Sequence, residues 1–165
     1  MSKKKKNKET KTNVMRILDK AKIPYEERTY EHNDDEPFDG ETVARKLGED
    51  PSMVYKTLVT HGKSGDYFVF VLPVNEELNL KAAARSVGEK SVEMIHVRDI
   101  NKITGYIRGG CSPIGMKKQF VTVIDDSAEE LPLFYVSGGK RGTQVKLNPK
   151  QLANFIDAKF AAIIE

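Results

Sequence analysis

A glycine-rich segment in the second half of the chain constrains the fold more than any other feature. The stretch GYIRGGCSPIGMKK, residues 105–118, holds four of the twelve glycines and the single cysteine of the 165-residue sequence. Glycine loses more backbone freedom on folding than other residues and buries no side chain, so such a segment is costly to order. It does allow backbone N–H groups to approach a ligand oxygen closely. The segment therefore indicates either an oxygen-binding wall or a glycine-rich surface turn.

The spacing of these glycines excludes two common phosphate-binding motifs. A Walker-type loop needs Lys and then Ser or Thr directly after its second glycine, whereas Met116 and Lys117 follow Gly115. The fingerprint G-x-G-x-x-G of dinucleotide-binding proteins does not occur in the sequence. The segment is therefore not a nucleotide-phosphate loop of either kind.

Length, charge and cysteine content predict one domain in a reducing compartment. A chain of 165 residues is expected to build a single core. There are 27 basic and 24 acidic residues, and part of the net charge of +3 lies in the run Lys3–Lys6. We expect residues 1–11 to be a disordered basic arm and residues 12–165 to be one domain. One cysteine excludes an internal disulfide and, with no export signal, favours the cytoplasm.

The sequence predicts neither a membrane-spanning segment nor a metal site. Apolar residues near the N-terminus are interrupted by Arg16 and followed by Asp19, which is incompatible with a membrane span or an export signal. His32, His61 and His96 are scattered singly and no cysteine pair exists, so no cluster of metal ligands is expected.

Short strands and short helices are predicted to alternate in irregular order. Helical spacing and capping signals predict helices over residues 13–23, 40–47, 80–87, 97–104 and 149–157. Apolar and β-branched runs predict strands over residues 25–30, 54–61, 66–72, 92–95, 120–124, 132–136, 143–147 and 160–164. The pair Asn148-Pro149 is the clearest helix start. This order predicts an α+β domain with a mixed, curved (barrel-like) β-sheet and short flanking helices.

A lysine lies within one of the predicted strands. The two-residue period of a strand places Lys56 on the same face as Val54 and Leu58. If that face is buried, a cation lies against apolar side chains, which is costly unless the charge is paired or is used on a ligand. Alternatively, Lys56 extends into solvent from an edge strand. The sequence leaves both possibilities open.

Three motifs in this order resemble the YbaK/EbsC family of aminoacyl-tRNA deacylases, which is related to the editing domain of bacterial prolyl-tRNA synthetases. They are YKTL at residues 55–58, GYIRGGCSPIGMKK at 105–118 and YVSGGKRG at 135–142. The resemblance runs from the first predicted helix to the C-terminus and includes TYEH at residues 29–32 and the acidic loop around Phe38. Only the basic arm lies outside it.

The resemblance implies hydrolytic editing in trans of a tRNA that carries the wrong amino acid, typically Cys on proline tRNA. It implies that activity depends on Lys56 and that Gly109 and Gly110 donate backbone hydrogen bonds to the ester carbonyl. Further pocket residues implied by the resemblance are Tyr30, Phe38, Thr57, Ser137, Gly138 and Gln144. By its position alone, Phe38 also suits a plug over the core. The implied partners are the acceptor end of aminoacyl-tRNA(Pro) and prolyl-tRNA synthetase, and no metal or organic cofactor is implied.

The implied reaction suits these residue types. Ester cleavage needs hydrogen-bond donors aimed at a developing oxyanion, which a glycine-rich backbone supplies. A lysine ammonium can orient the terminal adenosine or the aminoacyl group. The resemblance further suggests that the thiol of a cysteinyl substrate attacks its own ester carbonyl and leaves as a cyclic thiolactone, so that the protein supplies geometry and no nucleophile.

Two residues leave alternatives open. Cys111 has no histidine near it in sequence, and we interpret it as a small apolar wall residue instead of a nucleophile. Gln144 stands where some relatives carry an acidic residue, so a neutral amide replaces a charged acceptor and the preferred amino acid is left open. Two alternative functions of the protein also stay open. One is a non-catalytic module that binds a nucleotide or an aminoacyl-tRNA end, and the other is the same chemistry on Ala- or Ser-charged tRNA.

Overall fold

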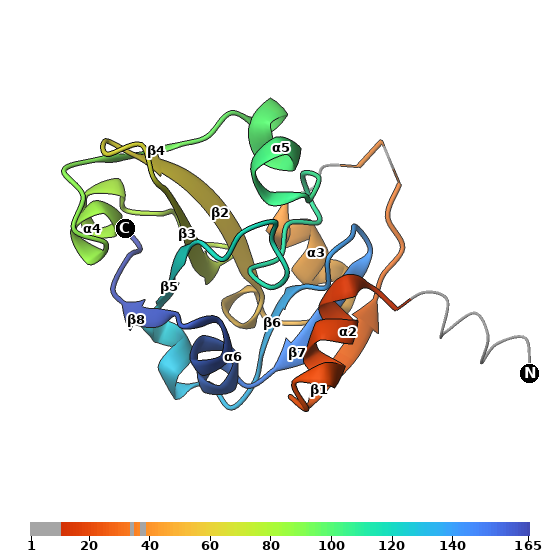
Figure 1. Ribbon diagram of the computed structural model, residues 1–165. Coiled ribbons are helices and arrows are strands. Elements are labelled where there is room, and N and C mark those ends of the chain that lie inside the picture. The colour runs from red at the N-terminus through yellow and green to blue at the C-terminus, as the bar shows by residue number, and fades with distance from the viewer. Residues whose placement is uncertain (1–10, 34, 37–38) are drawn as a thin grey trace, which may run out of the picture.

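The computed structural model describes residues 11–33, 35–36 and 39–165 (Figure 1). The predicted basic arm, apart from Lys11, and Phe38 lie outside these residues, so their predicted roles stay predictions. Among the described helices, none has the length and apolar content needed to cross a membrane.

The described strands form two sheets. An antiparallel sheet has the order β1 (Tyr25–Thr29), β7 (Thr143–Leu147) and β6 (Phe134–Ser137). A mixed sheet has the order β4 (Val92–Met94), β2 (Tyr55–Gly62), β3 (Tyr67–Pro73), β5 (Val121–Asp125) and β8 (Lys159–Ala161). A parallel bridge between Val54 and Tyr135 joins the two sheets. The predicted α+β class with mixed strand directions is confirmed, and the described strands form no closed barrel.

Short helices flank the sheets, as predicted. They are α2 (Asn13–Lys20), α3 (Gly40–Leu47), α4 (Leu80–Ser86), α5 (Ile100–Thr104) and α6 (Pro149–Ile156), with 3-10 turns η1 (Pro51–Met53), η2 (Val97–Asp99) and η3 (Asp126–Glu130). The predicted start of α6 is confirmed, because the Asn148 side chain accepts a hydrogen bond from the Gln151 amide at 2.9 Å. The last strand is shorter than predicted: β8 pairs with β5 at three positions, and Ile164 forms only an isolated bridge with Leu78.

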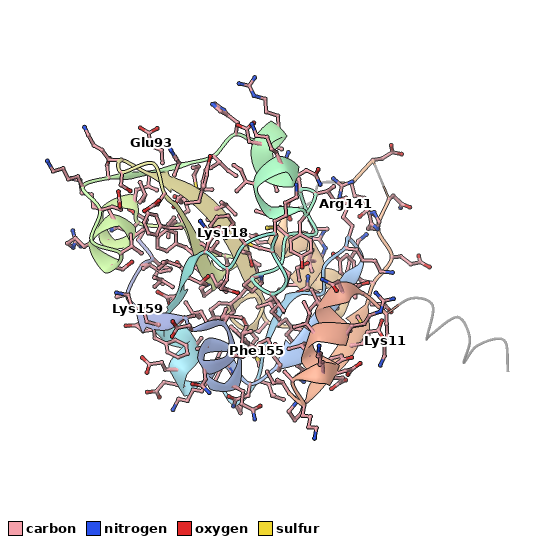
Figure 2. The ribbon with its side chains drawn as sticks, in the orientation of Figure 1. Lys11, Glu93, Lys118, Arg141, Phe155 and Lys159 are labelled. Atoms are coloured by element: carbon pink, nitrogen blue, oxygen red, sulfur yellow. The ribbon has the colours of Figure 1, made fainter. Side chains whose placement is uncertain are left out.

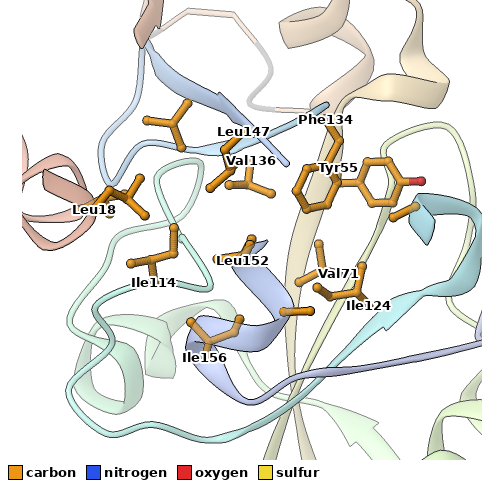
Figure 3. Packing of buried hydrophobic residues seen from close by; sticks show 14 of the residues in the cluster. Leu18, Tyr55, Val71, Ile114, Ile124, Phe134, Val136, Leu147, Leu152 and Ile156 are labelled. Carbon is orange, nitrogen blue, oxygen red and sulfur yellow. The ribbon is translucent and has the colours of Figure 1, made fainter. Parts of the chain in front are cut away.

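The largest hydrophobic core unites the two sheets with α2 and α6 (Figure 3). Tyr55 of β2 and Phe134 of β6 meet edge to face, with ring centroids 4.9 Å apart. Val59 lies in the same core. Because side chains alternate along a strand, the inward direction of Tyr55 and Val59 places Lys56 on the opposite face of the sheet.

Helix α3 is held against the point where the two sheets join. Ala44 of α3 packs with Val54, Val74 and Tyr135 in a separate buried cluster. A Cβ added at Gly40 would lie 2.3 Å from Val74 Cγ1, so only glycine fits at the first residue of this helix. This close approach fixes the N-terminus of α3 beside Val74, directly after β3.

Candidate functional site

A cavity of about 590 Å³ lies along an open edge of β2. Strand β4 pairs with β2 only at residues 60–62, so the first half of β2 has no β4 partner. The cavity walls come from β2, the start of α3, the segment from β4 to α5, the glycine-rich segment and the facing ends of β6 and β7. The volume is typical of pockets that bind small organic ligands.

Five of the predicted site residues line this cavity, namely Lys56, Thr57, Gly109, Ser137 and Gln144. They come from three stretches that are far apart in the sequence, and the fold brings them around one space. The lysine on the strand and the glycine-rich wall therefore belong to the same cavity, as the predicted site requires.

Gly110 does not line the cavity, and its amide is already used. Its N–H donates to the Ile107 carbonyl at 3.0 Å. A Cβ at this position would lie 3.0 Å from Lys140 Cα, in the turn between β6 and β7. The geometry therefore gives Gly110 a packing role in place of the predicted donor role, and Gly109 is the member of the pair that lines the cavity.

Gly138 and Tyr30, two further predicted pocket residues, lie beside the cavity. The Gly138 N–H donates to the Thr143 carbonyl at 2.9 Å, and a Cβ at Gly138 would lie 2.8 Å from Thr143 Cγ2, so this glycine closes the turn between β6 and β7. Tyr30 lines a smaller hollow that also touches Gly109. Phe38 is outside the described residues.

Contacts between the two glycine-rich segments fix the position of Gly109. The Arg141 Nε donates to the Arg108 carbonyl at 2.7 Å, directly before Gly109. The Tyr106 hydroxyl donates to the Ile114 carbonyl and so closes the segment on itself. Gly109 has a φ of 86°, a left-handed conformation that favours glycine.

Lys56 is a half-buried cation at the cavity. Burial lowers the pKa of its ammonium below the usual 10.5, while the carboxylates of Glu77, Glu41 and Glu76 act in the opposite direction. Its cross-strand neighbour is the fully buried Leu72. None of the described residues forms a hydrogen bond or an ion pair with this ammonium. Lys56 thus combines features of both alternatives. Its cross-strand neighbour is apolar and buried, as expected for a buried face. It also lies in the half of β2 that has no β4 partner, as expected for an edge strand.

Two buried polar atoms at the cavity have no hydrogen-bond partner among the described residues. They are Thr57 Oγ1 and Gln144 Oε1. Gln144 is only 6% exposed and pairs with Ser137 across β6 and β7. An unpaired buried polar group costs roughly 1–3 kcal/mol, and native proteins contain few of them. Both residues are among those that line the cavity.

Cys111 lines the same cavity and packs against the large core. Burial raises the pKa of its thiol to about 11. A thiol with such a pKa is protonated at neutral pH and is a poor nucleophile. The environment of Cys111 supports its interpretation as a wall residue.

Some residues that line the cavity were not predicted from the sequence. Met94, Val97, Ile100, Asp39 and Glu41 also line the cavity. The apolar spacing over residues 97–103 predicted a short helix and carried no signal that its side chains face a cavity. Within the described ranges, no group of three or more potential ligands could hold a metal ion.

Sequence comparisons connect the chain to a known family. The family model described as aminoacyl-tRNA editing domain matches residues 38–155. A protein of Enterococcus faecalis, named as a candidate Cys-tRNA(Pro)/Cys-tRNA(Cys) deacylase EbsC, is 44% identical over 159 residues, which cover 96% of each chain. A proline–tRNA ligase of Thermosipho melanesiensis is 29% identical over 101 residues, which cover 61% of this chain and 18% of the ligase.

Solved structures share the fold at low sequence identity. A hypothetical protein, APE2540, superposes with a TM-score of 0.84 at 21% identity and covers 93% of this chain and 100% of its own. A candidate trans-editing enzyme for prolyl-tRNA synthetase superposes with a TM-score of 0.77 at 21% identity, over 92% of this chain and 94% of its own. These likenesses concern the fold, whereas the family model and the 44% identical relative concern the sequence itself. The chain therefore belongs to the family of aminoacyl-tRNA editing domains, which makes it an aminoacyl-tRNA deacylase.

Proposed function

We propose that this protein removes cysteine from mischarged Cys-tRNA(Pro), acting in trans on tRNA that a synthetase has released. The observation that carries the proposal is the cavity shared by the Lys56 ammonium, the Gly109 backbone and the unpartnered Thr57 and Gln144 atoms. The name of the 44% identical relative, which refers to Cys-tRNA(Pro) and Cys-tRNA(Cys), supports cysteine as the amino acid.

In the proposed reaction the protein orients the substrate and stabilises charge. The substrate sulfur attacks the ester carbonyl carbon, a C–S bond forms, and the bond from this carbon to the ribose oxygen breaks. The thiol proton passes to the ribose oxygen, and cysteine leaves as a thiolactone that water then opens. The Gly109 N–H donates to the carbonyl oxygen as negative charge develops on it. Lys56 holds the aminoacyl-adenosine end in place as a partly desolvated cation.

Thr57 and Gln144 are the proposed contacts of the amino acid. An amide oxygen accepts a hydrogen bond from the substrate thiol or from its ammonium group without bringing a second charge into the cavity. A site with buried, unpaired polar atoms disfavours a substrate that leaves them unpaired, because their desolvation is then uncompensated. Alanine on the same tRNA is therefore proposed to be a poorer substrate than cysteine.

Prolyl-tRNA synthetase is the proposed source of tRNA selectivity. The net charge of +3 on 165 residues predicts weak binding of free tRNA. A complex that also contains the synthetase supplies the tRNA contacts that a small, nearly neutral domain lacks. We place this activity in the cytoplasm, in line with the single cysteine of the chain.

Release of amino acid from tRNA(Pro) charged with Cys, Pro, Ala or Ser tests the proposal. We expect the wild type to release Cys fastest and Lys56→Ala to fall to the uncatalysed rate. Lys159→Ala is the matched control, since it removes an exposed lysine from β8 on another side of the molecule (Figure 2). Equal background rates for wild type and Lys56→Ala would favour the non-catalytic binding module, and faster release of Ala or Ser would overturn cysteine as the substrate.

The route through the substrate thiol has a separate test. If the sulfur is the nucleophile, S-methylation of the charged cysteine blocks release although the ester is unchanged. Continued release of S-methylcysteine at the rate of cysteine would mean that water attacks the ester directly.

A further inference from the structure

The glycine-rich segment makes a tight turn at the cavity wall. The Gly110 N–H donates to the Ile107 carbonyl at 3.0 Å, so residues 107–110 form a β-turn. Gly109, the third residue of this turn, has a φ of 86°, whereas the φ of Arg108, the second residue, is negative. These signs identify a type II turn, whose third position favours glycine.

The type of this turn decides which way one peptide group points. Turns of type I and type II differ by a flip of the central peptide, which here joins Arg108 to Gly109. The described peptide bonds are all trans, and in a trans peptide the C=O and the N–H point in opposite directions. A flip would therefore exchange the places of the Arg108 carbonyl and the Gly109 N–H. No described residue accepts a hydrogen bond from that N–H, so the orientation of the peptide depends on what holds its carbonyl.

Arg141 holds this carbonyl from the turn between β6 and β7 (Figure 2). Its Nε donates to the Arg108 oxygen at 2.7 Å, a length typical of a charge-assisted hydrogen bond. The backbone of the same residue packs on the next glycine, since a Cβ added at Gly110 would lie 3.2 Å from the Arg141 nitrogen. Arg141 thus contacts the residues on both sides of Gly109.

We propose that Arg141 is a positioning residue for deacylation, which holds the Arg108–Gly109 peptide so that its N–H faces the ester carbonyl. The inference rests on the proposed function, in which this N–H donates to the developing oxyanion. Arg141 lines the smaller hollow, and Gly109 lines both that hollow and the cavity. The guanidinium also polarises the peptide that it binds, which makes the N–H a stronger donor. A flipped peptide would present a carbonyl oxygen, which repels negative charge.

Steady-state release of cysteine from Cys-tRNA(Pro) tests the positioning role. Arg141→Met keeps the length of the side chain and removes the guanidinium. We expect kcat to fall roughly 10- to 100-fold with KM changed less than about twofold, because an oxyanion donor acts mainly in the transition state. Arg141→Lys is expected to recover part of kcat, since its ammonium can still donate to the carbonyl. A rise in KM at unchanged kcat would make Arg141 a substrate-binding cation and would overturn the inference.

A matched control removes an arginine from another surface. Arg85→Met acts on an exposed residue of α4 and is expected to leave both kcat and KM unchanged. An equal fall in kcat in this variant would overturn the assignment to Arg141, because any lost arginine would then have the same effect.

A double-mutant cycle tests whether Arg141 acts through Gly109. Alanine is disfavoured at a φ of 86°, so Gly109→Ala shifts the turn away from type II. If both substitutions disorient the same N–H, the double variant is expected to lose no more activity than the weaker single variant. Losses that multiply would mean that the two residues act independently, which would overturn the inference.

The peptide contact has a readout that does not depend on activity. The sequence contains two Arg-Gly pairs, Arg108-Gly109 and Arg141-Gly142. Labelling arginine carbonyls with ¹³C and glycine nitrogens with ¹⁵N gives one NMR signal for each pair, and Arg141→Met leaves only the first. We expect the carbonyl resonance of that signal to move upfield, because a hydrogen bond to its oxygen is lost. An unmoved signal would overturn the inference, and Arg85→Met is expected to leave both signals in place.

These readouts separate the inference from the proposed function. If the wild type releases cysteine and Arg141→Met does so with the same kcat, the inference is overturned and the function stands. If the wild type releases another amino acid faster and Arg141→Met slows that release through kcat, cysteine fails as the substrate and the positioning role stands.

Discussion

The outer face of the three-stranded sheet has two polar ends that are built differently. Strand pairing puts Arg28, Tyr135 and Gln144 on this one face. At the closed end, the Tyr135 hydroxyl donates to Glu49 Oε1 at 2.7 Å and accepts from Arg28 Nη1 at 2.9 Å. At the open end, beside the cavity, Gln144 Oε1 has no partner among the described residues. Thr57 Oγ1 also has none there, although Thr57 lies in the other sheet, on the face of β2 that carries Tyr55.

The difference separates polar groups that are hydrogen-bonded within the protein from polar groups that are left unpaired. Tyr135 is fully buried, and the guanidinium of Arg28 and the ammonium of Lys146 lie 5.8 and 5.5 Å from the centre of its ring. Its hydroxyl is satisfied within the protein, so the closed end contributes to stability. The open end carries the cost of unpaired polar atoms, which a bound substrate would offset. Substitutions at the closed end should therefore lower stability and leave activity intact. Substitutions at the open end should lower activity and leave stability intact.

The largest effect is expected from the cation that faces the open end. Lys56→Met keeps the apolar stem of the side chain and removes the charge. We expect kcat/KM for deacylation to fall by about 100-fold or more, because one preorganised electrostatic contact to a reacting centre contributes on this scale. Activity within a few-fold of the wild type would show that the cavity acts without this cation.

The same variant should change how stability depends on pH. Burial lowers the pKa of Lys56, so the unfolded chain binds this proton more tightly than the folded chain, and protonation costs stability at neutral pH. That cost falls as pH rises from the folded pKa toward 10.5. We expect Lys56→Met to melt at a higher temperature than the wild type at pH 7, with a difference that narrows in alkaline buffer. A difference that widens there would contradict the direction of the shift.

The closed end should respond mainly in stability. Tyr135→Phe leaves the Glu49 carboxylate and the Arg28 guanidinium without their shared partner. We expect a loss of roughly 1–3 kcal/mol in the free energy of unfolding, measured in urea, with deacylation retained. Tyr67→Phe is the control, since its hydroxyl has no hydrogen-bond partner in the described part of the chain. Loss of activity without loss of stability in Tyr135→Phe would remove the distinction between the two ends.

The open end should show the reverse pattern, with a smaller change in stability. Thr57→Val replaces an unpaired hydroxyl by a methyl group of similar size. We expect slower release of cysteine, and stability equal to that of the wild type or up to about 1 kcal/mol higher. Thr60→Val on the same strand is the matched control: the Thr60 hydroxyl donates to the Phe68 carbonyl at 3.1 Å, so its loss should destabilise the fold. Equal destabilisation by both substitutions would mean that Thr57 has a partner in solution.

The smallest effect is expected at Cys111. Although this residue lines the cavity, its raised thiol pKa leaves little thiolate at pH 7. We expect Cys111→Ala to retain deacylation, and the folded wild type to react with iodoacetamide far more slowly than the unfolded chain. Loss of turnover in Cys111→Ala would make this thiol part of the chemistry.

Two neighbouring glycines show how much of the site could be predicted from the sequence. It singled out Gly109 and Gly110 together, and both were expected to donate to a substrate carbonyl. The structure divides them: Gly109 lines the cavity, while the Gly110 amide donates to Ile107 and its Cα faces Lys140 of another segment. A high density of glycine indicates that another group approaches the backbone closely. Whether this group is a ligand or another part of the chain depends on residues thirty positions away.

The sequence by itself determined the local elements and the chemical types at the site. The capping at Asn148, the helix α3 and the strands β2 and β3 follow from interactions within a few residues, which is why they were predicted with their bounds nearly correct. Only the tertiary structure decided that there are two sheets joined at Val54, that the open edge of β2 borders a cavity, and which polar atoms there stay unpaired. A cavity is the space left where distant surfaces do not meet, so no local pattern encodes it.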